Sequence, residues 1–422
     1  MTDKVLATIS LLLLIAFLGV VVAFVREIDL AIVILPAQAT PQAVRDCAAR
    51  KIGSIVLVAG GFAEVDHAGE DLQEELARAA RETGVRVLGP NTAGHISTPA
   101  AFTSSFFPLD EIPRGGISYV AQTGNFTGAM MKHIMSAENY GVARCIGLGN
   151  TVDIDETDVF EFLATDPHTK AIFFYLESLR RPREFIEIAK QVTPKKPVIV
   201  LKGGATADGA KAALSHTASM GSDDRILDGA LRQAGVVRID EFSHLFLAAK
   251  AVAPMPVPAG NRVGFVSPSG AFIVHISDLC RQRLNLTFPD LTPKTMDRLK
   301  EISPPFIRLS NPVDIFPSAT VHGMEFAYRE AMEAVLKDPN VDAVVSIMIL
   351  TRELGMPSLD FIPELARKHP KKPVYISFSG DHGCNEEAKV FLEPRGVPTF
   401  PLIEDAFKAL DVLVRARESL KK

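Results

Sequence analysis

The sequence predicts an α/β fold built on parallel sheets, and two observations carry this prediction. Short β-branched runs recur along the chain, beginning with LAIVIL at 30–35, SIVLVAG at 54–60 and VRVLG at 85–89. Helical stretches separate them, such as EDLQEELARAARETG at 70–84, which ends in Gly84, a residue typical of helix C-caps. Strands that alternate with helices in this way indicate doubly wound, parallel sheets.

An internal repeat refines the fold class, because four blocks recur in the same order in two parts of the chain. The pairs are GISYVAQTGNFTGAMMKHIM (116–135) with RVGFVSPSGAFIVHISDL (262–279), GNTVDI (149–154) with SNPVDI (310–315), DPHTKAIFFYLE (166–177) with DPNVDAVVSIMI (338–349), and KKPVIVLKGG (195–204) with KKPVYISFSG (371–380). The repeat predicts two copies of one flavodoxin-like domain, preceded by part of a third α/β unit.

Composition places the boundaries between these parts. The segment APMPVPAG at 253–260 holds three prolines and a glycine, which is typical of a linker. We therefore expect a hydrophobic segment at 1–27, a partial α/β unit at 28–107, and flavodoxin-like domains at 108–252 and 261–422.

Charge and cysteine content exclude several function classes. Lys and Arg number 45 against 50 Asp and Glu, a net charge of −5, so no basic field recruits nucleic acid. The four cysteines, Cys47, Cys145, Cys280 and Cys384, stand far apart, without a CxxC pair or a Cys/His pair at metal-ligand spacing. This pattern predicts no metal site and no disulfide scaffold, and it fits a reducing, cytoplasmic compartment.

One segment differs from the rest of the chain. Residues 5–25, VLATISLLLLIAFLGVVVAFV, carry no charge, and as a helix they would be about 30 Å long, the thickness of a bilayer core. A signal peptide is disfavoured because the apolar run is long and no A-x-A site follows it. We expect a membrane anchor here, and the alternative is foreign sequence joined to the domains by a misplaced start.

Two turns at strand ends have the composition of anion sites. Gln122-Thr123-Gly124-Asn125 follows one predicted strand, and Ser269-Gly270 follows the matching strand of the second copy. Ligands of open α/β sheets bind at such ends, where helix N-termini present N–H groups. Each turn alone is weak evidence, and the sequence has no GxGxxG, Walker A or nucleophile-elbow motif.

The loop after the first copy's KKP strand holds a candidate nucleophile. His216 lies among Ser215, Thr217 and Ser219 in a loop rich in small residues, and imidazole nitrogen is a competent phosphoryl acceptor. Glu177 ends the strand AIFFYLE where the second copy has an isoleucine, so its carboxylate could orient that imidazole. The alternative for His216 is an exposed loop histidine without a function, and the alternative for Glu177 is a carboxylate that caps a strand. The rival candidate for the nucleophile is His382, in SGDHGCNEE.

Several of these blocks together carry a family resemblance. GNTVDID, TKAIFFYLES, KKPVIVLKGG, SHTASMGSD and SNPVDI make residues 28–415 resemble the NDP-forming acyl-CoA synthetases. This is the ADP-forming acetate–CoA ligase group, related to the α subunit of succinyl-CoA synthetase. The resemblance implies that acyl-CoA, phosphate and ADP are interconverted with acid, CoA and ATP through an acyl phosphate and a phosphohistidine.

The resemblance also implies residue roles. It gives His216 the phosphoryl group and Glu177 its support. The residues it implies for phosphate are Gln122, Thr123, Gly124, Asn125, Ser269 and Gly270, and those for CoA are Pro36, Gly89, Pro90 and Asn91. Since no ATP-grasp module fits in the chain, it implies a separate β subunit that binds ADP or ATP and Mg²⁺, hence a hetero-oligomer.

Departures from the family pattern define the alternative. The family's opening strand and Gly-rich loop are replaced by residues 5–25, AQTG stands for SQSG, and Pro268 removes an N–H donor from the second turn. The competing hypothesis is a non-catalytic regulatory or scaffold protein, tethered to a membrane, that has kept the fold of the family.

Overall fold

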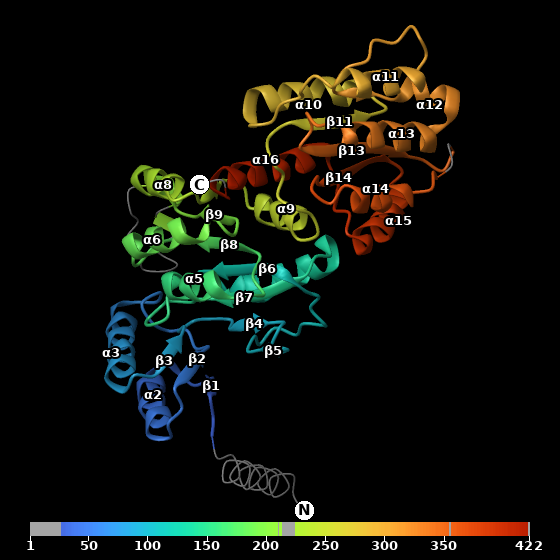
Figure 1. Ribbon diagram of the computed structural model, residues 1–422. Coiled ribbons are helices and arrows are strands. Elements are labelled where there is room, and N and C mark those ends of the chain that lie inside the picture. The colour runs from blue at the N-terminus through green and yellow to red at the C-terminus, as the bar shows by residue number, and fades with distance from the viewer. Residues whose placement is uncertain (1–26, 210, 213–223, 354–355, 421–422) are drawn as a thin grey trace, which may run out of the picture. The chain divides into compact units, whose positions relative to one another are not determined.

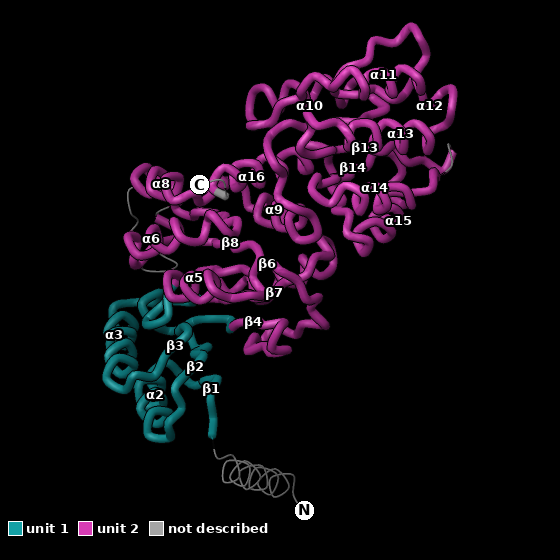
Figure 2. Tube along the Cα trace, in the orientation of Figure 1, with its two compact units in different colours: residues 1–94, 148–155 teal, residues 95–147, 156–422 magenta. Residues whose placement is uncertain are grey.

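The computed structural model describes residues 27–209, 211–212, 224–353 and 356–420. Contacts divide the chain into two compact units, one within residues 1–94 and 148–155 and one within 95–147 and 156–422, coloured separately in Figure 2.

The first unit contains a three-stranded parallel sheet in the order β1-β2-β3. Its strands are β1 (Leu30–Val33), β2 (Ser54–Leu57) and β3 (Arg86–Leu88), and its α-helices are α2 (Thr40–Ala49) and α3 (His67–Thr83). The side chain of Asp66 caps α3 by accepting from the Gly69 N–H, and Gly84 ends it at φ 72°. The three predicted strands and the predicted helix are therefore confirmed.

The larger unit begins with a seven-stranded sheet in the order β10-β9-β8-β6-β7-β4-β5. Its strands are β4 (His95–Ser97), β5 (Phe102–Thr103), β6 (Arg114–Ala121), β7 (Val142–Gly147), β8 (Ala171–Leu176), β9 (Val198–Lys202) and β10 (Val237–Ile239). Strand β4 pairs antiparallel with both β7 and β5. The other five follow the 2-1-3-4-5 order of flavodoxin. The helices are α5 (Glu156–Thr165), α6 (Pro182–Val192), α8 (Asp224–Gln233) and α9 (Ser243–Val252).

The segment after β6 differs from the single helix that the sequence predicts. It consists of three short pieces, η2 (Gly124–Thr127), α4 (Ala129–His133) and η3 (Ile134–Glu138). Gly128 separates the first two with non-helical angles (φ −126°, ψ −104°). The ring of Phe107 packs so close to Gly128 that a Cβ there would lie 2.5 Å from it.

The second repeat copy forms a five-stranded, all-parallel sheet in the order β12-β11-β13-β14-β15, again 2-1-3-4-5. Its strands are β11 (Val263–Ser267), β12 (Val313–Asp314), β13 (Ala343–Leu350), β14 (Val374–Gly380) and β15 (Thr399–Phe400). The α-helices are α10 (Gly270–Arg283), α11 (Pro293–Glu301), α12 (Phe316–His322), α13 (Met324–Lys337), α14 (Phe361–Lys368), α15 (His382–Leu392) and α16 (Ile403–Leu420). Figure 1 shows both sheets with their helices.

A lysine in the same place in both copies supports the repeat at atomic level. Lys196 Nζ donates to the carbonyls of Leu163 (2.8 Å) and Asp166 (2.9 Å). In the second copy, Lys372 Nζ donates to those of Leu336 (2.8 Å) and Asp338 (2.6 Å). The predicted fold class, with two flavodoxin-like domains, is confirmed.

One matched pair of blocks nevertheless occupies different sheets. In the second copy SNPVDI forms β12, beside β11. In the first copy GNTVDI leaves its own sheet and runs antiparallel to β3 of the first unit, where the N–H groups of Asn150, Val152 and Ile154 donate to the carbonyls of Pro90, Gly89 and Val87 at 2.8–3.1 Å. The sequence match alone does not reveal this exchange.

The C-terminal helix α16 joins the two copies. Leu410 and Leu413 belong to the core of the five-stranded sheet, whereas Val412 and Ala416 belong to the core of the seven-stranded sheet. At its end Ser419 Oγ donates to the Gly235 carbonyl (2.8 Å) beside β10. The proposed division at 253–260 therefore assigns α16 to one copy although it packs on both.

A buried ion cluster also links the copies. Lys250, on α9, is 4% exposed and contacts Glu393 of the second copy at 2.6 Å and Glu138 of the first at 3.3 Å. Asn139 Nδ2 donates to Glu393 at 3.0 Å. One buried ammonium therefore contacts two carboxylates, one from each copy.

We predict that Lys250→Met lowers the free energy of unfolding by about 3–5 kcal/mol, because it leaves buried carboxylates without their cation. Chemical denaturation followed by circular dichroism measures the change. Lys190→Met is the matched control, since its ion pair with Glu187 is exposed and we expect a loss of less than about 0.5 kcal/mol. Equal losses in both variants would contradict the prediction.

Candidate active site

The first flavodoxin-like sheet has its switch point between β6 and β8, where 2-1-3-4-5 sheets bind ligands at the carboxyl ends of the strands. Gln122 directly follows β6 and Glu177 directly follows β8. The structure brings these two predicted site residues together: Gln122 Oε1 accepts from the N–H of Glu177 at 2.6 Å and from that of Ser178 at 3.0 Å.

The Gln122 amide is fully occupied by protein partners. Besides those two acceptor bonds, Nε2 donates to Glu156 Oε2 (3.2 Å) and to the Ser178 carbonyl (3.1 Å), which uses both lone pairs and both donors of an amide. Glu156 is completely buried, and its Oε1 accepts from the Arg180 N–H at 2.6 Å. The backbone N–H of Gln122 donates to the Tyr175 carbonyl at 3.1 Å.

Glu177 is 7% exposed and held by two further groups. The Tyr175 hydroxyl donates to its Oε1 at 3.2 Å, and Lys202 Nζ donates to its carbonyl at 2.6 Å and to that of Gly203. Burial and the neighbouring Glu177 charge raise the pKa of Tyr175 to about 12. Burial lowers the pKa of Lys202, and the charge of Arg238 acts in the same direction, whereas those of Asp224 and Glu177 oppose it.

An aromatic wall lies beside this carboxylate. The ring of Phe242 is 6.0 Å from that of Tyr175 and 5.8 Å from that of Phe126, which is itself 6.2 Å from Tyr175. Phe242 is 40% exposed, so the wall has an open face. The strand end thus combines a fixed carboxylate with an apolar surface.

The two predicted anion turns differ in the helices that follow them. Thr123 Oγ1 accepts from the Asn125 N–H at 3.4 Å, but the 3₁₀ helix that begins at Gly124 is only four residues long. Ser269 and Gly270 stand at the start of α10, which is continuous over 14 residues. The macrodipole that favours an anion is therefore larger at the second turn than at the first.

The second copy closes its corresponding strand end differently. The N–H of Ile349, which stands where the first copy has Glu177, donates to the Tyr328 hydroxyl at 3.1 Å, and that hydroxyl donates to the Ile347 carbonyl. Pro268 stands where the first copy has Gln122. The second strand end therefore carries neither the glutamine nor the carboxylate.

The candidate nucleophile His216 lies outside the described residues, so its predicted role stays a prediction. The described chain resumes at Asp224, whose Oδ2 lies 2.9 Å from Arg238 Nη2. The rival His382 is exposed at the first position of α15. In the neighbouring strand β13, Ile349 occupies the position equivalent to Glu177. His382 therefore has no carboxylate at that position to orient it.

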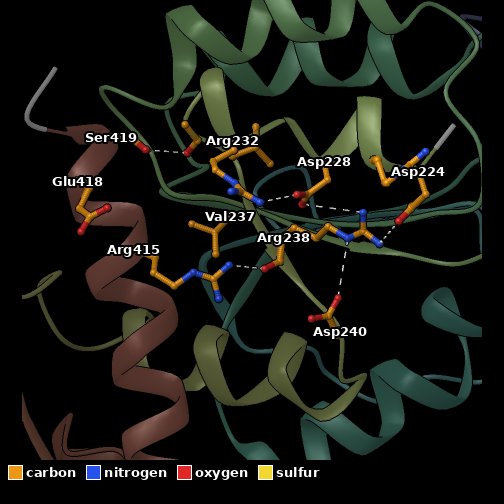
Figure 3. Close-up of a pocket in the computed structure, with 12 residues that line it drawn as sticks. Asp224, Asp228, Arg232, Val237, Arg238, Asp240, Arg415, Glu418 and Ser419 are labelled. Atoms are coloured by element: carbon orange, nitrogen blue, oxygen red, sulfur yellow. Dashed lines mark hydrogen bonds and ion pairs between the residues drawn. The ribbon is translucent and has the colours of Figure 1, made fainter. Parts of the chain in front are cut away.

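A cavity of about 740 Å³ lies near this region, between α8, β10 and the end of α16 (Figure 3). Arginines and carboxylates line it in equal number: Arg225, Arg232, Arg238 and Arg415 with Asp224, Asp228, Asp240 and Glu418. Arg238 is paired with Asp224 at 2.9 Å and lies within 3.9 Å of Asp228 and Asp240. The balanced charge does not favour an anionic ligand, and neither Gln122 nor Glu177 lines the cavity.

The predicted CoA residues lie in the first unit, at the carboxyl ends of its strands. Pro36 is exposed after β1, and Gly89-Pro90-Asn91 follows β3. Gly89 has φ 112°, and a Cβ there would lie 2.5 Å from the Leu57 carbonyl oxygen. Only glycine fits such a close approach of backbones.

Sequence reasoning missed a second set of polar residues at that edge. Asn91 Nδ2 donates to Asn150 Oδ1 (3.3 Å), and Asn150 Nδ2 donates to Glu64 Oε2 (2.6 Å) and Gln73 Oε1 (2.9 Å). Burial alone would raise the pKa of Glu64, but hydrogen bonds from the Gly61 N–H and Asn150 hold it below its usual range. A sequence signal for this contact was Gly149, at the start of GNTVDI. The structure explains the glycine, because its φ is 64° and it packs against the Pro90 carbonyl.

Comparisons with known proteins fit this architecture. The succinyl-CoA ligase-like flavodoxin domain family matches residues 114–252, and the CoA-binding domain family matches residues 19–97. The α subunit of acetate–CoA ligase [ADP-forming] II from Pyrococcus furiosus is 33% identical over 93% of this chain and 85% of its own length. The chain belongs to the family of ADP-forming acetate–CoA ligases. The predicted family is confirmed.

Two further relatives define the extent of the match. Acetate–CoA ligase [ADP-forming] II of Archaeoglobus fulgidus is 34% identical, and the chain spans 56% of its length. The structure of acetyl-coenzyme A synthetase 1 from Ca. Korarchaeum cryptofilum, in complex with phosphate and ADP, superposes with a TM-score of 0.83 at 30% identity, covering 94% of this chain and 86% of that one.

The predicted membrane anchor at 5–25 lies outside the described residues. In the part of the chain that the structure describes, no helix is both long and apolar enough to cross a bilayer. The CoA-binding family match begins at residue 19, inside the predicted anchor, so part of that segment aligns with the domain whose first half the sequence prediction regarded as absent.

Proposed function

We propose that this chain is the α-type subunit of an ADP-forming acyl-CoA synthetase, which converts acyl-CoA, phosphate and ADP to the free acid, CoA and ATP. The observation that carries this proposal is Glu177 at the switch point of the first flavodoxin-like sheet, a buried residue whose backbone N–H is bound by Gln122 and whose carboxylate is bound by the Tyr175 hydroxyl. The family membership of the chain supplies the reaction class.

The chemistry divides among the strand ends. A phosphate oxygen attacks the thioester carbonyl and CoA thiolate leaves, giving an acyl phosphate. An imidazole nitrogen of His216 then takes the phosphoryl group and the carboxylate of the acid leaves. Glu177 is a hydrogen-bond acceptor suited to orient that imidazole. Backbone N–H groups at Thr123, Gly124 and Gly270 are suited to hold phosphate oxygens, whereas those of Asn125 and Ser269 donate to the hydroxyls of Thr123 and Ser267.

CoA binding belongs to the first unit in this proposal. Pro36, Gly89, Pro90 and Asn91 stand at the carboxyl ends of its strands, and Asn150 and Glu64 extend the polar edge. The CoA-binding family match over residues 19–97 supports this assignment.

The nucleotide step belongs to a partner. Two relatives from Pyrococcus furiosus are named as α subunits, which supports an ATP-grasp β subunit that brings ADP or ATP and Mg²⁺ in a hetero-oligomer. The chain spans about half of the longer Archaeoglobus enzyme. A cytoplasmic site of action fits the four cysteines, none of which forms a disulfide.

Phosphorylation tests the central step. Incubated with its β subunit and γ-labelled ATP, the chain should acquire an acid-labile, base-stable label, and His216→Asn should abolish it because it removes the nucleophilic nitrogen. His382→Asn is the matched control and should keep the label. An unlabelled wild-type chain, or a label that survives His216→Asn, would disprove the phosphohistidine.

CoA binding separates the enzyme from a regulatory or scaffold protein. Calorimetry should give a micromolar dissociation constant. Asn150→Ala should weaken CoA binding roughly fivefold to tenfold, because Asn91 and Glu64 lose the side chain that holds them, at a cost of about 1 kcal/mol of binding free energy. Asn340→Ala, an exposed amide in the second copy, should bind CoA as the wild type does. A chain that neither binds CoA nor becomes phosphorylated would instead be the scaffold.

The membrane tether through residues 5–25 is tested by fractionation. A genuine anchor predicts that the full-length chain sediments with membranes and resists carbonate extraction, whereas a chain starting at Arg26 does not sediment. Recovery of the full-length chain in the supernatant would rule out the tether.

A further inference from the structure

We propose that Gln122 and Lys202 are positioning residues that fix Glu177 by its two flanking peptide groups, and that the Gln122 side chain does not contact phosphate. This inference rests on the proposed function, because the role of Glu177 belongs to it.

The Gln122 amide oxygen accepts from the N–H groups of both peptides that flank Glu177, its own N–H and that of Ser178. Both groups follow the last residue of β8, where the ladder of the sheet ends and a backbone donor needs another partner. The amide is itself oriented by Glu156, which accepts from Nε2 at 3.2 Å. Because both Nε2 hydrogens are in use, the side chain can donate to a phosphate oxygen only by releasing Glu156 or the Ser178 carbonyl.

On the C-terminal side, Lys202 reaches from the end of β9 to the end of β8. Leu176 and Lys202 are paired in the sheet, and Lys202 Nζ donates to the Glu177 carbonyl at 2.6 Å. Lys202 is 9% exposed. Burying an ammonium costs free energy unless its hydrogen bonds are satisfied. An apolar residue would therefore end this strand at a lower free-energy cost than Lys202.

The second copy shows that the flavodoxin-like fold does not require this arrangement. It keeps Lys372 in the place of Lys196, with the same two carbonyl bonds. At the three positions equivalent to Gln122, Glu177 and Lys202 it has Pro268, Ile349 and Phe378. The glutamine and the lysine are thus absent where the carboxylate is absent, which indicates that they serve Glu177 rather than the sheet.

Positioning matters because a carboxylate that orients an imidazole must be held within about 0.5 Å of its productive place. Removing the outer-shell partners of metal-ligating histidines typically costs 10- to 100-fold in activity, and we expect a loss of the same order here. A phosphate ligand would act differently, since its loss weakens the binding of phosphate and raises KM for it.

The test uses the chain assembled with its β subunit, with Gln122→Met and Lys202→Met. We expect each variant to lower kcat about 10- to 100-fold, and to slow phosphorylation of the histidine equally in single turnover, with KM for phosphate within twofold of wild type. Lys202→Arg should recover most of the rate, because a guanidinium also donates to two carbonyls.

Lys196→Met is the matched control, because it removes a lysine that binds two carbonyls at the opposite end of the same strand. It should lower the melting temperature without changing kcat. A raised KM for phosphate with unchanged kcat in Gln122→Met would make Gln122 a phosphate ligand and overturn the proposal. Unchanged rates in both methionine variants would also overturn the proposal. So would a Lys202→Arg variant that folds normally but does not recover the rate. If the wild type is not phosphorylated, the proposed function fails instead.

Discussion

The candidate site depends on how the peptide after β8 is held. At a switch point the chains leaving two neighbouring strands turn in opposite directions, so the first peptides beyond the strands lose their partners in the sheet. In the first copy a side chain replaces the missing partner: Gln122 accepts from the N–H groups of Glu177 and Ser178, and Lys202 donates to the Glu177 carbonyl. The backbone of Glu177 therefore has a defined place, and the Tyr175 hydroxyl holds its carboxylate at 3.2 Å.

The two copies show how one fold serves two roles. Both have the 2-1-3-4-5 strand order and the lysine that binds two carbonyls at the amino end of its strand. They differ at the carboxyl ends, where the second copy uses the Tyr328 hydroxyl to bind the N–H of Ile349. A tyrosine hydroxyl, uncharged at neutral pH, closes the strand end without presenting a charge. The second copy provides the longer helix, α10, at its own turn. The copies are thus complementary, one with a fixed carboxylate and the other with a strong helix start.

Sequence reasoning predicted what depends on local pattern. Hydrophobic periodicity located β1, β2 and β3, and the repeat located the flavodoxin-like sheets. Comparison of the copies also identified Glu177, because an acidic residue at the end of a buried strand departs from its apolar counterpart. The structure leaves His216 untested, since it lies outside the described residues.

What sequence reasoning missed depends on contacts between distant segments. The helix after β6 is interrupted at Gly128, where the ring of Phe107, twenty-one positions earlier, packs too close for a Cβ. Asn150 reaches Glu64 and Gln73 because GNTVDI pairs with β3 rather than with its own sheet. In the sequence, Lys202 looks like the first residue of a Gly-rich loop. In the structure, the pairing of β8 with β9 places it beside the Glu177 carbonyl.

Helix α16 and the ion cluster around Lys250 restrict how the strand ends of the two copies can move relative to each other. Helix α16 has residues in both hydrophobic cores, and Lys250 is buried between Glu138 of the first copy and Glu393 of the second. Sliding one copy past the other would expose apolar surface of α16 and separate a buried ammonium from its carboxylates, and each step is costly. Glu138 ends the segment that starts with the turn Gln122 to Asn125, so the ion cluster constrains the far end of the piece of chain that carries that turn. Packing between the two copies, at a distance from the candidate site, therefore fixes the spacing between that turn and the start of α10.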